Sequence, residues 1–193
     1  MAQGGLSRRG FLTASIILLA PAVPVLRALG GNRQVIAFES AVDIVEFTDD
    51  GVRKGIVRVA KVVKTDEAWR RQLSPIAYHV ARERGTEVPF SGAYWDLHDK
   101  GLFRCICCET ALFASSAKFD SRTGWPSFWQ PIAKENVRHG EPSSGYSESE
   151  VTCRRCDAHL GDLFDDGPQP TGLRYCIDSV SLRFINAKSD LLR

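Results

Sequence analysis

Two segments of the chain share one cysteine spacing: Cys105-Ile106-Cys107-Cys108 and, later, Cys153-Arg154-Arg155-Cys156. Two Cys-x-x-Cys pairs are typical of a structural zinc site, because four thiolates fill the tetrahedral coordination of the ion and leave no position for water. Such an ion would tie two distant segments together and stabilise the fold without taking part in a reaction. The predicted zinc ligands are Cys105, Cys108, Cys153 and Cys156.

The cysteine pairs leave alternatives open. Two disulfides would suit an oxidising compartment, and a single Cys-x-x-Cys is also a redox motif. The matching spacing of the two pairs favours zinc over either alternative. Cys107 could replace Cys108 as a ligand, although pairing Cys105 with Cys108 fits the usual spacing better.

The segments around the cysteines predict a mainly β domain. From Gly85 onward, Gly and Pro divide the chain into short pieces, with strands expected at 103–106, 151–152 and 174–184. A helical region should precede them, capped by Thr65 or Asp66, and Ser74-Pro75 could split it into two short helices. The expected buried face of this helical region consists of Trp69, Leu73, Ile76, Ala77 and Val80.

Two segments rich in Val, Ile and Phe, 35–47 and 52–63, come before the helical region. Thr48-Asp49-Asp50-Gly51 separates them, and an Asp-Gly turn of this kind predicts a β-hairpin. The expected organisation is therefore a targeting segment over 1–30, a β-hairpin arm over 31–64 and one catalytic domain over 65–187.

The N-terminal segment has the arrangement of a twin-arginine export signal. Ser7-Arg8-Arg9-Gly10-Phe11-Leu12 leads directly into an apolar stretch that ends near Leu26. A membrane-spanning helix needs about 20 apolar residues, whereas this stretch contains Pro21 and Pro24 and is followed by Arg27. We therefore expect a cleaved signal, a periplasmic protein and no stable membrane span after the signal is removed.

The charge balance argues against a nucleic-acid ligand, which calls for a clustered basic face. The formal charge is +2, with 44% hydrophobic and 25% charged residues. Three of the basic residues are Arg8, Arg9 and Arg27 in the expected signal, and the rest of the chain has 22 basic and 23 acidic residues. This composition is that of an ordinary globular domain.

Seven further motifs give the chain a specific resemblance. In order along the chain they are Gly85-Thr86-Glu87-x-Pro89-Phe90, Tyr94-Trp95, Lys118-Phe119-Asp120, Gly124-Trp125-Pro126-Ser127-Phe128-Trp129, Cys156-x-Ala158-His159-Leu160-Gly161, Phe164-Asp165-Asp166-Gly167-Pro168 and Thr171-Gly172-Leu173-Arg174-Tyr175-Cys176. Together they resemble the methionine-R-sulfoxide reductase domain from about Trp69 to Phe184. The resemblance implies two antiparallel sheets, a four-cysteine zinc site remote from the catalytic centre, and Cys176 as the nucleophile.

The chemistry of the residues agrees with that role for Cys176. A thiolate can attack the sulfur of a sulfoxide once the oxygen is protonated, which releases methionine and leaves a sulfenic acid. Cys176 and Cys107 are the cysteines outside the zinc set, and the motif favours Cys176. In a strand, Arg174, Cys176 and Asp178 share one face, so the arginine can favour the thiolate.

Other side chains complete the expected site. His159 can donate a proton to the departing oxygen or hydrogen-bond with it, since imidazole can be charged near neutral pH. Trp125, with Phe128 or Trp129, would form an aromatic wall for the methyl-thio group of the substrate.

The chain departs from the family pattern near Cys176. Asp162 stands where relatives usually carry a second histidine, and Asp178 stands where they carry an asparagine. A carboxylate beside Cys176 raises the pKa of its thiol, although two close aspartates could share one proton and supply the acid. Glu148 replaces a common arginine, and Thr123 replaces a common resolving cysteine.

These departures leave two main hypotheses for the function. The first is a thiol-dependent reductase for methionine R-sulfoxide, free or in proteins, which uses an external thioredoxin-like thiol, or Cys107 where the geometry allows, to reduce the sulfenic acid. The second is a catalytically weakened or inactive relative that serves as a zinc-stabilised binding module. A redox or metal-carrying role for the Cys-x-x-Cys pairs is a third.

Overall fold

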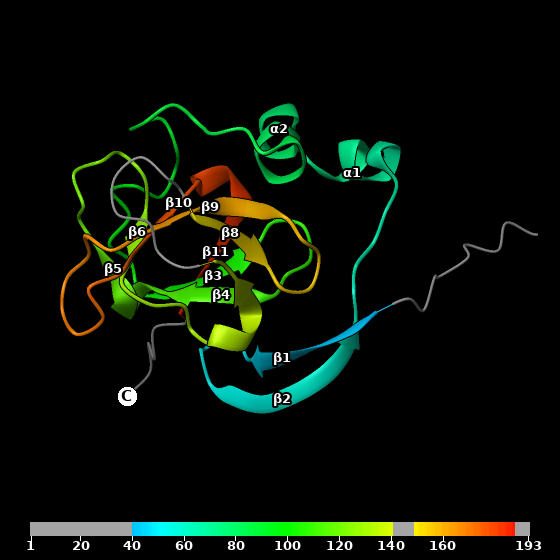
Figure 1. Cartoon of the computed structure of the whole chain (residues 1–193), viewed down its shortest axis with the longest axis horizontal. Helices are drawn as coiled ribbons and strands as arrows, with labels where there is room; N and C mark the ends of the chain where they lie inside the picture. The colour runs from blue at the N-terminus through cyan, green and yellow to red at the C-terminus, as the bar shows by residue number, and fades with distance from the viewer. Residues whose placement is uncertain (1–39, 141–148, 188–193) are drawn as a thin grey trace, which may run out of the picture. The chain divides into compact units, whose positions relative to one another are not determined.

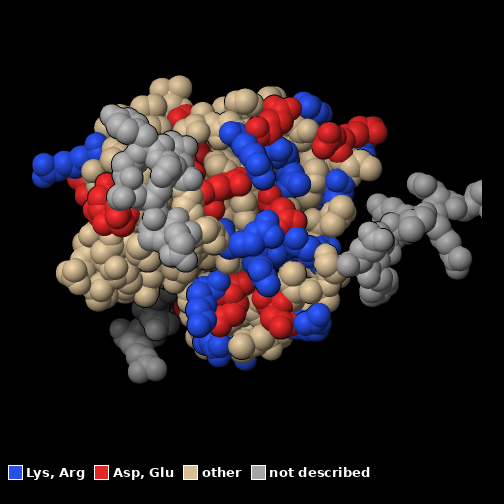
Figure 2. All heavy atoms as spheres, viewed as in Figure 1, with Lys and Arg blue, Asp and Glu red and all other residues tan. Residues whose placement is uncertain are grey.

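The structure is a computed structural model that describes residues 40–140 and 149–187. The twin-arginine segment and Glu148 lie outside these residues. Among the residues described, no helix is long and apolar enough to cross a membrane. On the face seen in Figure 2, acidic and basic side chains are interspersed.

Antiparallel strands dominate the fold, as predicted (Figure 1). A six-stranded sheet has the order β5-β6-β10-β9-β8-β7, and a three-stranded sheet has the order β11-β3-β4. The strands of the larger sheet are β5 (Lys118–Phe119), β6 (Ser127–Phe128), β7 (Val137–Arg138), β8 (Ser149–Cys153), β9 (His159–Phe164) and β10 (Arg174–Ile177). Those of the smaller sheet are β3 (Gly101–Cys105), β4 (Ala111–Ala114) and β11 (Leu182–Asn186). Short 3-10 turns are η1 (Ser115–Ala117), η2 (Lys134–Asn136) and η3 (Ser179–Ser181).

The segment 174–184 is not the single strand that the sequence suggested. Strand β10 ends at Ile177, η3 turns the chain at Ser179–Ser181, and β11 joins the other sheet. Asp178 is the residue directly before this turn, and its side chain makes no capping bond to it. It therefore lies just beyond the strand that carries Cys176.

The predicted hairpin consists of β1 (Ala41–Phe47) and β2 (Arg53–Ala60), which pair antiparallel. Gly51 has a φ of +82° in the turn, a conformation that glycine adopts without strain. Asn136 attaches β1 to the rest of the domain, because its side chain bonds the N–H and C=O of Val45 at 2.7 and 2.8 Å and the carbonyl of Ala111 at 2.8 Å.

The helical region is split in two. Thr65 caps α1 (Asp66–Gln72), and Ser74 caps α2 (Pro75–Glu83), whose first residue is a proline. Figure 1 shows both helices on one side of the sheets and the hairpin on the other. Four of the five expected face residues are buried, but Ile76 is 47% exposed, because α2 restarts with a new rotational phase after the break.

The core between the sheets is aromatic. Phe113 of β4 stacks on Phe128 of β6 with ring centroids 4.4 Å apart, and Phe103 of β3 meets Phe128 edge-on at 5.0 Å. All three rings are fully buried. This contact fixes β6, and with it the neighbouring β10, against the smaller sheet.

Candidate active site

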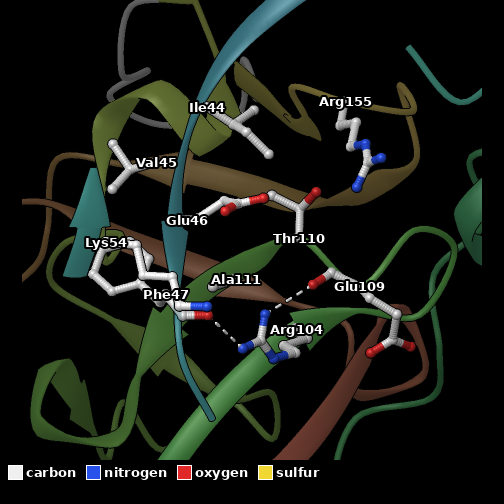
Figure 3. Close-up of a pocket in the computed structure, with 10 residues that line it drawn as sticks. All are labelled: Ile44, Val45, Glu46, Phe47, Lys54, Arg104, Glu109, Thr110, Ala111 and Arg155. Carbon is white, nitrogen blue, oxygen red and sulfur yellow. Dashed lines mark hydrogen bonds between the residues drawn. The ribbon is translucent and has the colours of Figure 1, made fainter. Parts of the chain in front are cut away.

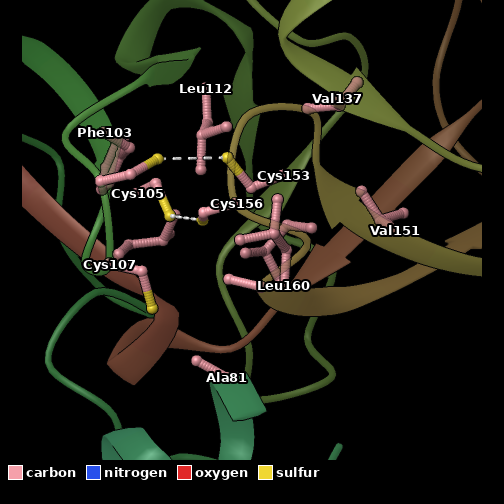
Figure 4. Close-up of a cluster of buried hydrophobic side chains, with 14 of the residues drawn as sticks. Ala81, Phe103, Cys105, Cys107, Leu112, Val137, Val151, Cys153, Cys156 and Leu160 are labelled. Carbon is pink, nitrogen blue, oxygen red and sulfur yellow. Dashed lines mark hydrogen bonds between the residues drawn. The ribbon is translucent and has the colours of Figure 1, made fainter. Parts of the chain in front are cut away.

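The two cysteine pairs meet in the core, and their four sulfurs lie within 4.8 Å of one another (Figure 4). Sγ of Cys105 is 3.6 Å from Sγ of Cys156, and Sγ of Cys108 is 3.5 Å from Sγ of Cys153. A tetrahedral zinc ion with bonds of about 2.3 Å holds its sulfurs about 3.8 Å apart. The cluster therefore has the chemistry and the spacing to hold a metal ion.

The same geometry argues against disulfides at these cysteines. All six cysteines are free thiols, and the sulfur distances exceed the roughly 2.05 Å of a disulfide. Cys107 is 4% exposed, and Figure 4 shows its sulfur pointing away from the cluster toward Ala81. Cys108 rather than Cys107 therefore completes the set of four.

Cys176 lies apart from this cluster, in a pocket of about 150 Å³. In the larger sheet it is paired with Asp162 of β9 on one side and Ser127 of β6 on the other, and directly opposite residues share a face. Gly161 allows β9 to approach, because an added Cβ there would lie 2.1 Å from the carbonyl oxygen of Cys176. The residues that line the pocket are Thr86, Trp125, Gly161, Asp162, Phe164, Cys176 and Asp178.

Opposing charges act on the Cys176 thiol. Burial raises its pKa, and the carboxylates of Asp178 and Asp162 raise it further, whereas Arg174 and the Thr123 hydroxyl lower it. Oγ1 of Thr123 is 4.0 Å from the sulfur. The net pKa is raised, so the free site favours the thiol over the thiolate.

Arg174 is fixed by a partner that the sequence did not single out. Its Nε and Nη2 donate to the two carboxylate oxygens of Asp166 at 2.7 and 2.8 Å, and its guanidinium covers the ring of Phe164 at 4.2 Å. This two-point contact holds the pKa of Asp166 below its usual value. It also keeps a positive charge beside Cys176.

Asp178 combines deep burial with a position in the pocket. It is 3% exposed, and Oδ1 accepts from the backbone N–H of Glu87 at 2.8 Å. Burial is the main cause that raises its pKa to about 7. The carboxylates of Glu87 and Asp162 raise the pKa further, whereas the Glu87 N–H and His159 lower it. Asp178 can therefore carry a proton near neutral pH.

Glu87 organises this side of the pocket, although the sequence showed only that it belongs to a motif. Its carboxylate accepts from the backbone N–H groups of Ser179 and Val180 at 2.7 and 3.1 Å. Its own carbonyl accepts from Nε1 of Trp125 at 3.2 Å. One buried residue thus positions both the turn after β10 and the indole at the pocket.

His159 does not line the pocket but lies behind Asp178. Its Nε2 is 3.9 Å from Oδ2 of Asp178, and its Nδ1 donates to Oε1 of Glu150 at 2.9 Å. A β-bulge between Val151 and Thr152 shifts the register of β8 and β9 at this point. His159 and Asp162 would face opposite ways in a regular strand, and the bulge lets both lie on the side of Glu150.

Of the predicted aromatic wall, only Trp125 lines the pocket. Phe128 is fully buried in the core contact with Phe113, so the prediction that it faces the substrate is wrong. Trp129 is half-buried, and its carbonyl accepts from Thr171 at 2.7 Å. The second aromatic side chain of the pocket is Phe164, which the sequence showed only as part of a motif.

A second pocket, of about 180 Å³, lies beside the hairpin (Figure 3). Arg104 crosses it and donates to the carbonyls of Phe47 and Glu109, both at 3.0 Å. These bonds hold the hairpin against β3. The residues that line this pocket include no cysteine or histidine, so we place the thiol chemistry at the Cys176 pocket.

The fold and the two cysteine sites define a class of protein: a β-domain with a metal-binding thiol cluster in its core and a separate thiol in a pocket. The SelR domain model matches residues 73–186. The chain therefore belongs to the methionine-R-sulfoxide reductase family, and it is an oxidoreductase.

Several curated proteins are similar to this chain over most of their own length. The peptide methionine sulfoxide reductase MsrB of Herminiimonas arsenicoxydans is 54% identical over 132 residues, which are 68% of this chain and 96% of that protein. The protein of the same name from Thioalkalivibrio sulfidiphilus is 56% identical over 62% of this chain and 88% of its own length. That from Hahella chejuensis is 50% identical over 67% and 94%, respectively.

Proposed function

We propose that this chain reduces methionine R-sulfoxide with Cys176 as the nucleophile and Asp178 as the proton donor. The observation that carries the proposal is the pocket itself, where a thiol and a buried carboxyl group of raised pKa lie beside Trp125 and Phe164. Family membership supports the reaction. Nothing in the comparisons favours the alternative of a non-catalytic binding module.

In the first step, the Cys176 thiolate attacks the sulfoxide sulfur while Asp178 protonates the oxygen. The oxygen moves to the cysteine sulfur, so the products are methionine, a sulfenic acid on Cys176 and an ionised Asp178. The methionine sulfur gains two electrons, and the cysteine sulfur loses two. Arg174 favours the thiolate, and Trp125 and Phe164 contact the methyl-thio group.

Burial raises the pKa of the Cys176 thiol, and Asp178 and Asp162 raise it further and so disfavour the thiolate that attacks the substrate. A proton held on Asp178 gives this arrangement a use in the reaction. Burial, with a smaller contribution from the carboxylates of Glu87 and Asp162, raises the pKa of Asp178 and so keeps a proton there. Asp178 can then donate that proton to the sulfoxide oxygen. The activity should therefore depend on a group that titrates near neutral pH.

The sulfenic acid is reduced by an external thiol in this proposal. Cys107 is buried beside the metal-binding cluster, whereas Cys176 is partly accessible at its pocket. Two thiols, or one dithiol of the thioredoxin type, return Cys176 to the thiol and leave as a disulfide with release of water. Oxidised proteins and free methionine sulfoxide are both candidate substrates.

Zinc is the metal that we propose for the four-cysteine cluster. Four thiolates in tetrahedral spacing select zinc among common cellular ions and leave no open coordination position. The ion would join the β3–β4 segment to the β8–β9 segment. Its role is structural, and no step of the reaction passes through it.

We also propose that the chain is exported by the twin-arginine pathway to the periplasm and that residues 1–30 are its signal. The support is the sequence around Arg8 and Arg9 and the apolar stretch that follows. Because this pathway carries folded proteins, the zinc site could be filled before export. Fractionation of cells that express the wild type and Arg8→Lys/Arg9→Lys would test this proposal: periplasmic activity should be lost in the variant.

Trapping the intermediate tests the proposed nucleophile. Methionine R-sulfoxide is added to the zinc-loaded protein without reductant, and sulfenic acids are labelled with dimedone and located by mass spectrometry. We expect one label, on Cys176, and the same label in Cys107→Ser. A label on Cys107 alone, or none while methionine is formed, would refute the assignment.

A further inference from the structure

Four side chains, Asp178, His159, Glu150 and Arg84, lead from the Cys176 pocket toward the surface. Oδ2 of Asp178 is 3.9 Å from Nε2 of His159, Nδ1 of His159 donates to Glu150 at 2.9 Å, and the same Glu150 oxygen is 3.3 Å from Nε of Arg84. Side-chain exposure rises along this line, from 3% at Asp178 and 8% at His159 to 33% at Glu150 and 73% at Arg84. The line therefore runs from a buried acid to solvent.

The reaction requires protons inside the pocket. Transfer of the sulfoxide oxygen to Cys176 takes one proton from Asp178. When an external thiolate then attacks the sulfenic sulfur, a mixed disulfide forms and the oxygen leaves as water, which takes a second proton. A second thiolate releases the Cys176 thiolate and the disulfide product. Each turnover thus consumes two protons and two thiolates at the site.

The pocket is a poor route for these protons. Its volume of about 150 Å³ is small enough for a methyl-thio group and its neighbouring carbons to fill it. Asp178 is then closed off on the pocket side, and its other oxygen is already bonded to the N–H of Glu87. This other oxygen is Oδ1, whereas Oδ2 lies 3.9 Å from Nε2 of His159.

We propose that His159 and Glu150 form a proton relay that recharges Asp178 from solvent, with Glu150 as a positioning residue that holds the imidazole ring. The relay, defined as Asp178, His159 and Glu150, deepens the proposed function and rests on it. The bond from Nδ1 to Glu150 orients Nε2 toward Asp178. The imidazolium delivers its Nε2 proton to Asp178, and the neutral ring must then turn over so that the free nitrogen takes up a solvent proton on the side of Glu150.

The geometry requires one small movement. The gap of 3.9 Å between Nε2 and Oδ2 exceeds a hydrogen bond by about 1 Å, so a side-chain rotation must close it before transfer. Titratable groups act on Asp178 from three parts of the fold: Glu87 in the segment between α2 and β3, Asp162 and His159 on β9, and Cys176 on β10. The raised pKa of Asp178 is consistent with an acid that exchanges protons with imidazole.

The test compares Glu150→Gln with a matched control elsewhere in the fold. Glu83 bonds Nδ1 of His79 at 3.1 Å on α2, so Glu83→Gln removes the same charge from the same kind of pair away from the pocket. At about pH 8, we expect kcat with saturating dithiothreitol to fall about 10-fold in Glu150→Gln and to change less than about twofold in Glu83→Gln.

Chemical rescue separates a relay from a structural pair. In Glu150→Gln, kcat at about pH 8 should rise with the concentration of imidazole buffer, recover as the pH falls toward 6, and be largely retained in Glu150→Asp. A loss that is equal at all pH values and insensitive to imidazole, or no loss at all, would overturn the relay.

A measurement without turnover keeps the relay distinct from the reductase function. The His159 ring is titrated by NMR in the wild type, Asp178→Asn and Glu150→Gln. We expect both substitutions to change its titration, and Glu83→Gln to leave it unchanged. If the titration of His159 is the same in the wild type and in Asp178→Asn, the relay is refuted even when the enzyme is active. If the titration changes but the protein shows no turnover, only the proposed reaction is refuted.

Discussion

Asp178→Asn removes the charge of a buried carboxyl group without changing its shape. The amide oxygen can still accept from the N–H of Glu87, which bonds Asp178 at 2.8 Å. The substitution should therefore preserve the fold and remove the unfavourable burial of a charge. We expect it to stabilise the protein above neutral pH.

The size of this effect follows from the pKa of Asp178, which is raised from 3.8 to about 7. At about 1.36 kcal/mol per pKa unit, ionised Asp178 destabilises the fold by up to about 4 kcal/mol. Between the two pKa values the unfolded chain binds fewer protons than the folded one, so stability falls as the pH rises. The destabilisation is complete above about pH 7 and is about 2 kcal/mol at about pH 5.5.

Urea unfolding of zinc-loaded wild type and Asp178→Asn, followed by circular dichroism, measures this effect. The variant should be more stable by up to about 4 kcal/mol at about pH 8 and by about 2 kcal/mol at about pH 5.5. Asp165→Asn, at an exposed position, is the control and should show no such pH-dependent gain. Equal gains for Asp178→Asn at both pH values would refute the raised pKa.

Three other predictions concern the acid, the hairpin and the metal. Asp178→Asn should lower kcat about 100-fold, and adding Asp162→His, which restores the usual family pair, should recover much of it; an unchanged kcat in the single variant would contradict Asp178 as the donor. Asn136→Ala removes three buried hydrogen bonds and should lower the free energy of unfolding by about 3 kcal/mol in urea titrations. Cys153→Ser should lose zinc in elemental analysis and melt at lower temperature, whereas Cys107→Ser should keep one zinc per chain.

Local sequence signals predicted much of the fold because they depend on neighbouring residues alone. The turn at Asp50-Gly51 placed the hairpin, and Ser74-Pro75 ended one helix and began another, as the structure shows. The metal-binding cluster was located although its two halves are distant in the sequence, because the matched spacing of the cysteine pairs indicates a shared ligand. Ile76 was misplaced since its orientation depends on the phase of α2 after the break.

The arrangement of the pocket depends on contacts between distant segments, which the sequence does not display. Glu87 reaches Asp178 across 91 positions. The bulge in β8 and β9 determines that His159 faces Glu150. Phe128 follows Ser127, which pairs with Cys176, but the alternation of side chains along β6 sends the phenyl ring into the core.

The most direct test of the reductase assignment is the consumption of the two methionine sulfoxide epimers by zinc-loaded wild type and Cys176→Ser, with excess dithiothreitol. We predict that the wild type consumes the R epimer and spares the S epimer, and that the folded, zinc-containing variant consumes neither. Equal consumption of both epimers, consumption by the variant, or no consumption by the folded wild type would contradict the account.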